Sequence, residues 1–184
     1  MRESVKTAVN AMIGLNDITL KGEIAVFGST YMSKFPLYEF INKCQLESAV
    51  YNRSIEGLTI EEALEIVKAC IIAIMPKKVF IALGEEDENA KDAIKNYSEI
   101  VKKIRSAIPE CSIYLIELLG ESEYVAKFND NIISLCDNKK IEHIRFVSPQ
   151  LSEMGICKAR FKQMSCFFRD EPLNMVEAFT MANL

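Results

Sequence analysis

The chain has 184 residues; nearly half are apolar, about a quarter are charged and only five are proline. This composition excludes a disordered or fibrous protein, and the length suits one buried core better than two. The net charge is −4, and the lysines and arginines are scattered along helical patterns. Because a nucleic-acid partner requires a concentrated basic face, we expect a globular protein that does not bind nucleic acid.

No segment of the sequence predicts a membrane span or a secretion signal. The longest uninterrupted apolar run covers residues 69–75, whereas a bilayer span needs about 20 residues. Residues 1–6 lack the apolar core of a secretion signal. The six cysteines contain no Cys-x-x-Cys pair and the chain has a single histidine, which argues against a structural metal centre. We therefore expect a cytoplasmic protein with reduced thiols and with neither metal nor cofactor.

Helical and extended segments alternate along the chain. A first helix is expected within residues 1–14, where apolar residues recur at helical spacing. Short, mainly apolar segments predict strands at residues 24–27, 48–51, 79–83 and 112–118, and a fifth strand is expected at residues 141–147. Further helices are predicted at about residues 36–44, 60–75, 89–107, 121–136 and 172–182, with irregular structure after Pro149. Thr59 and Glu62 form a capping-box sequence at the start of the helix at 60–75.

This alternation, with its short connections, predicts a parallel sheet covered by helices on both faces. The expected fold class is a flavodoxin-like α/β three-layer sandwich with five strands in the order 2-1-3-4-5. The sequence contains no internal repeat and no linker, so residues 1–184 are expected to form one domain with its core in residues 23–182. In such a fold the loops that leave the C-terminal ends of the strands build the functional crevice.

The loops after the first three predicted strands resemble those of the SGNH/GDSL hydrolases, a family of esterases and acyl hydrolases. Gly28-Ser29-Thr30 lies where that family has its Gly-Asp-Ser block, with the nucleophilic serine last. Gly57 takes the place of a glycine whose amide helps to form the oxyanion hole. Residues 84–87, Gly-Glu-Glu-Asp, fall on the third block, usually Gly-x-Asn-Asp, whose asparagine also binds the oxyanion. The resemblance therefore implies a site at the crevice of the predicted sheet.

The resemblance extends to the last block, Asp-x-x-His, at residues 170–173. Asp170 matches its aspartate, but Leu173 stands where the base histidine belongs. Thr30 likewise replaces the nucleophilic serine, and Glu86 replaces the oxyanion asparagine. Leucine cannot accept a proton, and an ionised glutamate only accepts hydrogen bonds, so it would repel an oxyanion. Only Gly57 and Asp170 are retained, and the family's catalytic triad is not assembled.

Two other features bear on the chemistry of the crevice. His143 is expected about four residues before the end of the fifth strand, roughly 13 Å from the crevice edge, where it cannot replace the missing base. Residues 85–88 form an acidic run that could hold Mg²⁺ or Ca²⁺ through oxygen ligands. The same run could be a solvated loop whose charges favour the N-terminus of the following helix. We favour the second interpretation and expect no metal site.

Our leading hypothesis is a degenerate SGNH-like protein, not an enzyme, that binds a small molecule or a partner at the former active-site crevice. The molecule would be an ester, an acyl compound or a carbohydrate-like ligand. The residues expected to contact it are Ser29, Thr30, Arg53, Gly57, Glu86 and Asp170. An active esterase or acyl hydrolase remains an alternative, with Thr30 or Ser29 as nucleophile and Asp170 or Glu86 as base. A protein-interaction module is the third hypothesis, and the sequence does not define the oligomeric state.

Overall fold

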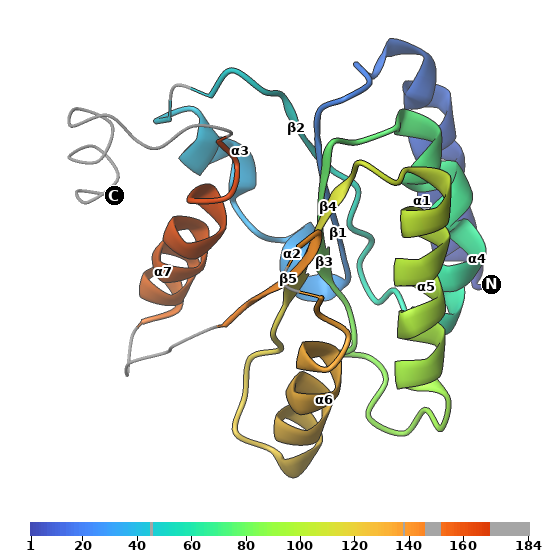
Figure 1. The fold of residues 1–184 in the computed structure, drawn as a ribbon, viewed down its shortest axis with the longest axis vertical. Coiled ribbons are helices and arrows are strands. Elements are labelled where there is room, and N and C mark those ends of the chain that lie inside the picture. The colour runs from blue at the N-terminus through green and yellow to red at the C-terminus, as the bar shows by residue number, and fades with distance from the viewer. Residues whose placement is uncertain (45, 138, 146–151, 170–184) are drawn as a thin grey trace.

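A computed structural model describes residues 1–44, 46–137, 139–145 and 152–169 (Figure 1). Its centre is a five-stranded parallel sheet in the order β2-β1-β3-β4-β5, which confirms the predicted topology. The strands are β1 (Ile24–Gly28), β2 (Val50–Asn52), β3 (Lys78–Ala82), β4 (Ser112–Ile116) and β5 (Ile141–Ile144). The helices are α1 (Glu3–Leu15), α2 (Thr30–Ser33), α3 (Leu37–Ile41), α4 (Ile60–Cys70), α5 (Ala93–Ala107), α6 (Glu123–Ile133) and α7 (Glu153–Ser165), with the 3₁₀ helices η1 (Asn16–Ile18) and η2 (Ile72–Ile74).

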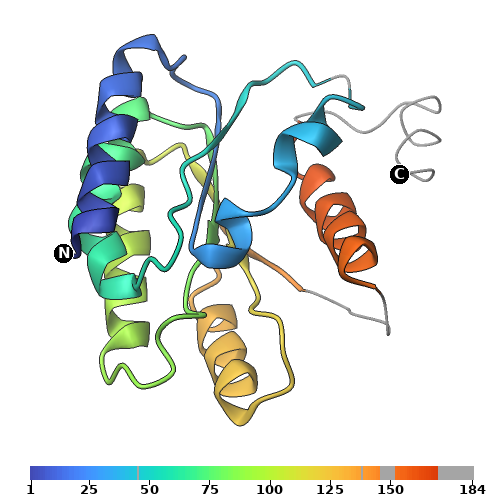
Figure 2. The ribbon, with the colours of Figure 1, turned by 180° about the vertical axis from the view of Figure 1, so that it is seen from behind.

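Helices cover both faces of the sheet, as the sequence predicts. Helices α1, α4 and α5 stand together on one side, and α3 and α7 lie on the other (Figures 1 and 2). Successive residues of β1 point to opposite faces: Ala25 and Phe27 belong to the apolar core under α4 and α5, and Ile24 and Val26 to the core under α3 and α7. Both cores form because every residue of β1 is apolar or glycine and fully buried.

Several elements differ from their predictions, among them α2, which the sequence did not indicate. Helix α7 lies in a stretch expected to be irregular, because Arg160 takes a buried position on its inner side and interrupts the apolar pattern. Helix α5 begins at Ala93 rather than at residue 89, because residues 84–92 form turns after β3. Strand β5 ends at Ile144 rather than at residue 147. The helix predicted at 172–182 lies outside the described residues.

Thr59 is the N-cap of α4, as its place in the capping-box sequence predicts, whereas the Glu62 carboxylate accepts hydrogen bonds from Arg2. Thr59 Oγ1 accepts a hydrogen bond from Glu62 N at 3.3 Å, which satisfies one of the free amides of the first helical turn. Helix α4 therefore begins immediately after the loop that carries Gly57, and its first turn lies beside the candidate site described below.

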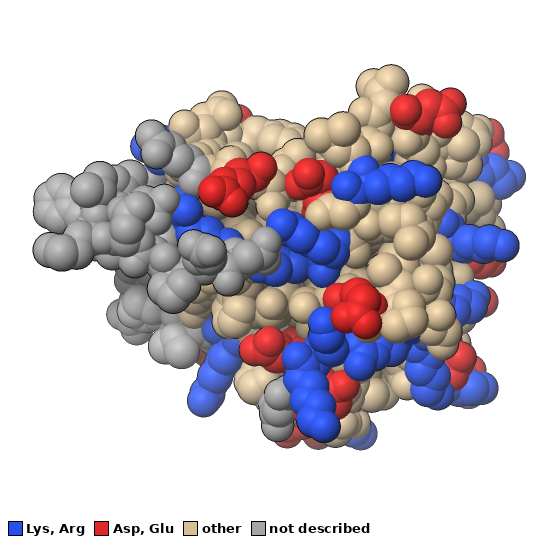
Figure 3. Space-filling model, turned by 45° about the horizontal axis from the view of Figure 1, so that its top comes forward, with Lys and Arg blue, Asp and Glu red and all other residues tan. Residues whose placement is uncertain are grey.

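The surface shows no large field of one charge on the face drawn in Figure 3, where acidic and basic side chains are interspersed. Among the described residues, no helix combines the length and the apolar character that crossing a membrane requires.

Candidate functional site

Thr30 is the centre of the candidate site. It is the first residue of α2, directly after β1, and its hydroxyl donates a hydrogen bond to Glu86 Oε1 at 2.6 Å. The same hydroxyl accepts a hydrogen bond from the Gly57 amide at 2.8 Å. Loops that follow β1, β2 and β3 therefore meet at one point, because the C-terminal ends of parallel strands lie at the same edge of a sheet. The structure brings together the three residues that the sequence placed in these loops.

In these contacts, the groups at the nucleophile and oxyanion positions of an acyl-transfer site form hydrogen bonds with one another. An oxyanion requires donors aimed at the position where its negative charge develops. Here the Gly57 amide already donates to Thr30, and the Glu86 carboxylate, an acceptor, lies beside the same hydroxyl. The arrangement holds the threonine side chain in place and offers no donor to a tetrahedral intermediate from either Gly57 or Glu86.

The structure corrects the roles expected for Ser29 and Arg53. Ser29 is fully buried, so its side chain does not face a ligand in the crevice. Arg53 is 4% exposed, and its guanidinium donates to Met12 O at 2.9 Å and to Thr19 Oγ1 at 2.7 Å. Arg53 therefore ties the end of β2 to α1 and to the segment after η1. Its side chain leaves the sheet on the α1 side.

Asp170 and Leu173 lie outside the described residues, so their place in the site stays a prediction. The last described residues lie near the opposite edge of the sheet from Thr30. Lys78 Nζ donates to the carbonyl oxygens of Phe167 at 2.9 Å and of Arg169 at 2.8 Å, and Lys78 is the first residue of β3. Thr30 and Glu86, in contrast, follow the last residues of β1 and β3.

His143 is closer to the end of its strand than expected. It is the third of the four residues of β5 and pairs with Leu115 of β4. Strand β5 is separated from β1 by β3 and β4, so three inter-strand spacings, roughly 14 Å, lie between His143 and the strand that leads to Thr30. Lateral distance rather than depth along the strand therefore keeps this histidine, the only one in the chain, away from the Thr30 hydroxyl.

Two carboxylates of the acidic run at residues 85–88 organise the loop after β3 through contacts that the sequence did not predict. Glu85 Oε1 accepts a hydrogen bond from the Tyr31 amide at 2.8 Å, in the first turn of α2. Burial raises the pKa of Glu85, and the neighbouring charge of Glu86 acts in the same direction. Asp87 is 3% exposed and accepts a hydrogen bond from Ile60 N, at the start of α4, at 3.1 Å and 3.2 Å to its two oxygens. Burial also raises the pKa of Asp87. Asp87 matches the aspartate of the Gly-x-Asn-Asp block, and this match is the feature of the sequence that could have identified it.

Arg2 is a further residue that the sequence reading did not identify. Its Nη2 donates to the carbonyl oxygen of Gly57 and to Glu62 Oε2, the latter at 2.5 Å. Gly57 adopts a φ of +71°, and a Cβ atom there would lie 3.3 Å from the Arg2 guanidinium. Hydrogen bonding to Arg2 lowers the pKa of Glu62 to about 2. Arg2 thus fixes Gly57 from the side opposite to Thr30.

Replacing Arg2 by alanine is expected to reduce the free energy of unfolding at pH 7 by about 1–2 kcal/mol, because Arg2 is half exposed and water screens the ion pair. Because the pKa of Glu62 is lowered in the folded protein, its ionised carboxylate stabilises the fold at pH values above about 4.5, the pKa of glutamate in the unfolded chain. This contribution is lost as the pH falls towards 2. The difference between wild type and Arg2→Ala should therefore shrink below pH 4.5. Urea denaturation from pH 2.5 to 7 measures it, with Lys6→Ala, which removes an exposed ion pair, as the control. A constant difference would contradict the pairing.

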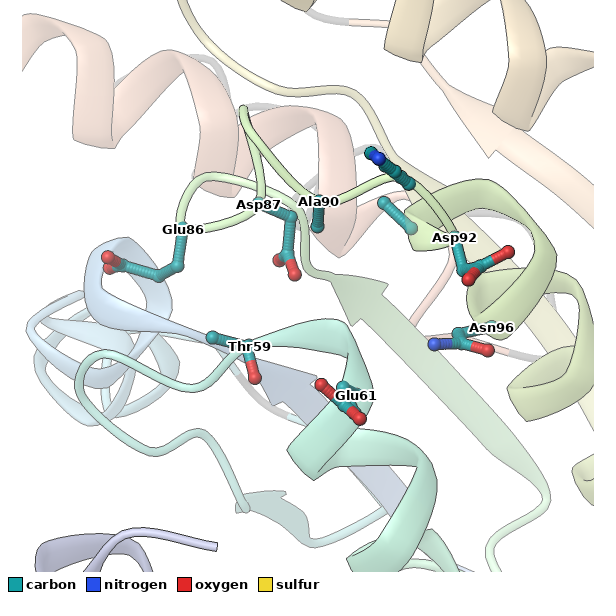
Figure 4. Close-up of a pocket in the computed structure, with 9 residues that line it drawn as sticks. Thr59, Glu61, Glu86, Asp87, Ala90, Asp92 and Asn96 are labelled. Atoms are coloured by element: carbon teal, nitrogen blue, oxygen red, sulfur yellow. The ribbon is translucent and has the colours of Figure 1, made fainter.

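A cavity of about 260 Å³ lies beside Glu86 (Figure 4). It is lined by Thr59, Glu61, Glu86, Asp87, Ala90, Lys91, Asp92, Ala93 and Asn96. In Figure 4, Glu86 and Asp87 lie across the cavity from Thr59, and Asp92 and Asn96 lie on the side of α5. Four carboxylates face one lysine here, so the cavity suits a ligand with hydroxyl or N–H donors. Within the described ranges, no group of three or more histidine, cysteine or acidic side chains is placed to hold a metal ion.

These elements define an α/β protein with a candidate site at the C-terminal edge of a parallel sheet. No protein-family model matches the chain, and no curated protein matches it. Solved structures do. A Streptococcus pneumoniae protein described as a platelet activating factor has a TM-score of 0.78 at 18% identity, over 91% of this chain and 94% of that one. A GDSL-like lipase from Bacteroides thetaiotaomicron has a TM-score of 0.68 at 13% identity, over 96% of this chain and 98% of that one.

A lipase/acylhydrolase from Enterococcus faecalis is also similar, with a TM-score of 0.64 at 16% identity, over 83% of this chain and 98% of that one. The chain therefore has the fold of the SGNH/GDSL hydrolases. The strand order and the positions of the loops after β1, β2 and β3 are those that the sequence resemblance implied.

Proposed function

We propose that this chain is an SGNH-fold protein without acyl-hydrolase activity that binds a small polar ligand at the C-terminal edge of its sheet. The observation that carries the proposal is the pair of hydrogen bonds made by Thr30. Its hydroxyl donates to Glu86 and accepts from the Gly57 amide. The residue at the nucleophile position is therefore hydrogen-bonded both to the glycine of the oxyanion hole and to the glutamate that replaces the oxyanion asparagine.

The chemistry of the surrounding side chains supports binding in place of hydrolysis. A serine-type acyl transfer needs a base near the nucleophile and donors for the oxyanion. The only histidine of the chain is in β5, so it is not the base for Thr30. Glu86, which is hydrogen-bonded to Thr30, is an acceptor and offers no donor to an oxyanion. Carboxylates at this edge, Glu86 and Glu61 among them, would instead accept hydrogen bonds from hydroxyl or N–H groups, as carbohydrate-like ligands provide.

The contact between Thr30 and Glu86 also favours a second candidate, an esterase with Thr30 as nucleophile and Glu86 as base. At 2.6 Å the two groups are within the distance that proton transfer requires. This candidate is weaker for two reasons. A carboxylate is a poor base for an alcohol at neutral pH. The Gly57 amide would have to leave Thr30 before it could bind an oxyanion.

Hydrolysis of p-nitrophenyl acetate and butyrate between pH 5 and 8 tests the proposal. We expect turnover no more than marginally above background, because losing one oxyanion donor alone costs about 10²–10³ in kcat in a serine hydrolase. Thr30→Ala should leave the measured rate unchanged. The matched control is Thr7→Ala, on the exposed face of α1. Saturable hydrolysis that Thr30→Ala and Glu86→Gln both abolish, and that Thr7→Ala retains, would establish the esterase instead.

A further inference from the structure

Helix α1 has a second face that stays exposed in the described part of the chain. Its first face packs on the core through Val5 and Val9, and Asn16 Nδ2 ties the end of the helix to α4 by donating to Ala69 O at 2.9 Å. In Figure 2, α1 lies in front of α4 and α5, with its outer side open. The exposed face therefore lies on the outside of the layer that these three helices form.

The residues of this face follow the spacing of a helix–helix contact. Each of the first four precedes an inward-facing residue by one position, which turns it by about 100° around the helix axis. They recur at alternating intervals of four and three residues, as in the seam of a coiled coil. We call this set the outer seam: Ser4, Ala8, Ala11, Leu15 and Ile18. Ile18 ends η1, which continues directly from α1.

The largest side chains of the outer seam are open to solvent. Leu15 is 50% exposed and Ile18 is 77% exposed. Ser4 and Ala11 are exposed as well, and Ala8 is partly buried. The opposite side of α1 carries exposed polar residues instead: Glu3, Lys6 and Asn10. Single exposed apolar residues are common, but two at the end of an uncharged seam with coiled-coil spacing indicate an interaction surface.

The order of side-chain sizes along the outer seam indicates what covers it. The seam is small in its first half and large at its end. Two copies packed antiparallel would place Ile18 of each copy opposite Ser4 of the other, and Leu15 opposite Ala8, with Ala11 at the two-fold axis. Each large side chain then meets a small one, so the space between the helices is filled without a clash. A parallel pair would set the large residues against each other and leave a gap between the alanines.

Charge and length are also consistent with a second copy of this chain. The outer seam contains no charged residue, so pairing it buries no unpaired ion. It runs from residue 4 to residue 18, which is about 21 Å at 1.5 Å per residue. A contact confined to one helix of this length is smaller than the standard protein interface of about 1,600 Å². We therefore expect a dimer that dissociates on dilution.

We propose that the protein forms a two-fold symmetric dimer in which the outer seams of two α1 helices pack antiparallel. Sedimentation equilibrium across a wide range of protein concentration tests this inference, and we expect a monomer–dimer equilibrium. Ala11→Arg brings two large cations together at the axis and should weaken association at least about tenfold. The matched control is Asn10→Arg, which adds the same charge to the polar side of α1 and should dimerise as wild type. Arginine is a good helix former, so both variants should fold.

A second pair of exposed positions tests the antiparallel direction. Ile18→Ala should weaken association at least about tenfold, because each dimer then buries two fewer isoleucine side chains. Ser4→Leu combined with Ile18→Ala exchanges the large and small positions and should recover most of the lost affinity. A double variant that associates no more tightly than Ile18→Ala would overturn the antiparallel dimer. A wild type that stays monomeric at every concentration, or an Ala11→Arg protein that dimerises as well as Asn10→Arg, would overturn it too.

Discussion

Replacing Gly84 by alanine is expected to destabilise the protein by about 3–5 kcal/mol, since backbone strain and overpacking each cost about 1–3 kcal/mol. Gly84 has a φ of +120°, which residues with a Cβ atom rarely adopt. The added Cβ would lie 2.4 Å from Cζ of Phe128. Phe128 is 2% exposed and packs edge-on against the Tyr97 ring, at 5.8 Å and 84°, so its ring cannot move aside. Urea denaturation at neutral pH measures the change.

Gly14→Ala is the matched control for this variant. Gly14 lies within α1, and a Cβ atom there would meet nothing within 4 Å. Alanine is favoured over glycine in a helix by about 1 kcal/mol, so this variant should be as stable as wild type or more stable. If Gly84→Ala proved as stable as Gly14→Ala, this result would contradict the close packing of Phe128 against the turn after β3.

A substitution at Gly84 should also affect the candidate site, because the turn that contains Gly84 positions the side chains of Glu85 and Glu86. The Tyr124 hydroxyl donates to Gly84 O at 2.6 Å and fixes the turn to α6. The next two residues, Glu85 and Glu86, then reach the Tyr31 amide and the Thr30 hydroxyl. A partly folded Gly84→Ala protein should therefore also lose the ligand binding that we propose for this site.

The fold was largely predictable because its signals are local. The central strands β1, β3 and β4 are mostly apolar, and alternation with helices leaves few ways to order parallel strands. The N-cap at Thr59 also needs only neighbouring residues. Helix α7 was not predictable in this way, because buried Arg160 is stabilised by contacts with Glu117 O and the Tyr31 ring, which are distant in sequence.

Site residues could be predicted from the sequence where their position in the backbone places them in the site. They could not be predicted where the direction of the side chain determines what it contacts. Thr30, Gly57 and Glu86 each follow the end of a strand, so the topology alone brings them together. Arg53 also follows a strand, but its side chain leaves on the α1 side, and Ser29, one residue before Thr30, points into the protein. Arg2 could not be placed, because its contact with Gly57 joins residues 55 positions apart.

Asp87 provides the second large stability effect, and its variants separate hydrogen bonding from charge. Asp87→Ala leaves the buried Ile60 amide without an acceptor and should cost about 2–3 kcal/mol, whereas Asp87→Asn keeps an acceptor oxygen and should cost less than about 1 kcal/mol at pH 7.

The pH dependence of Asp87→Asn tests the charge. Burial raises the pKa of Asp87 in the folded state, so the folded protein binds a proton more readily than the unfolded chain. The stabilising contribution of that proton is complete below the unfolded value, about 4, and is lost as the pH rises through the raised pKa. Asparagine does not titrate, so wild type should be more stable relative to Asp87→Asn at pH 4 than at pH 7. Chemical denaturation of both proteins across this range gives the difference directly. A difference that grew in favour of wild type towards pH 7 would mean that the Asp87 carboxylate is stabilised as an anion by the first turn of α4, and that its burial is not the dominant effect.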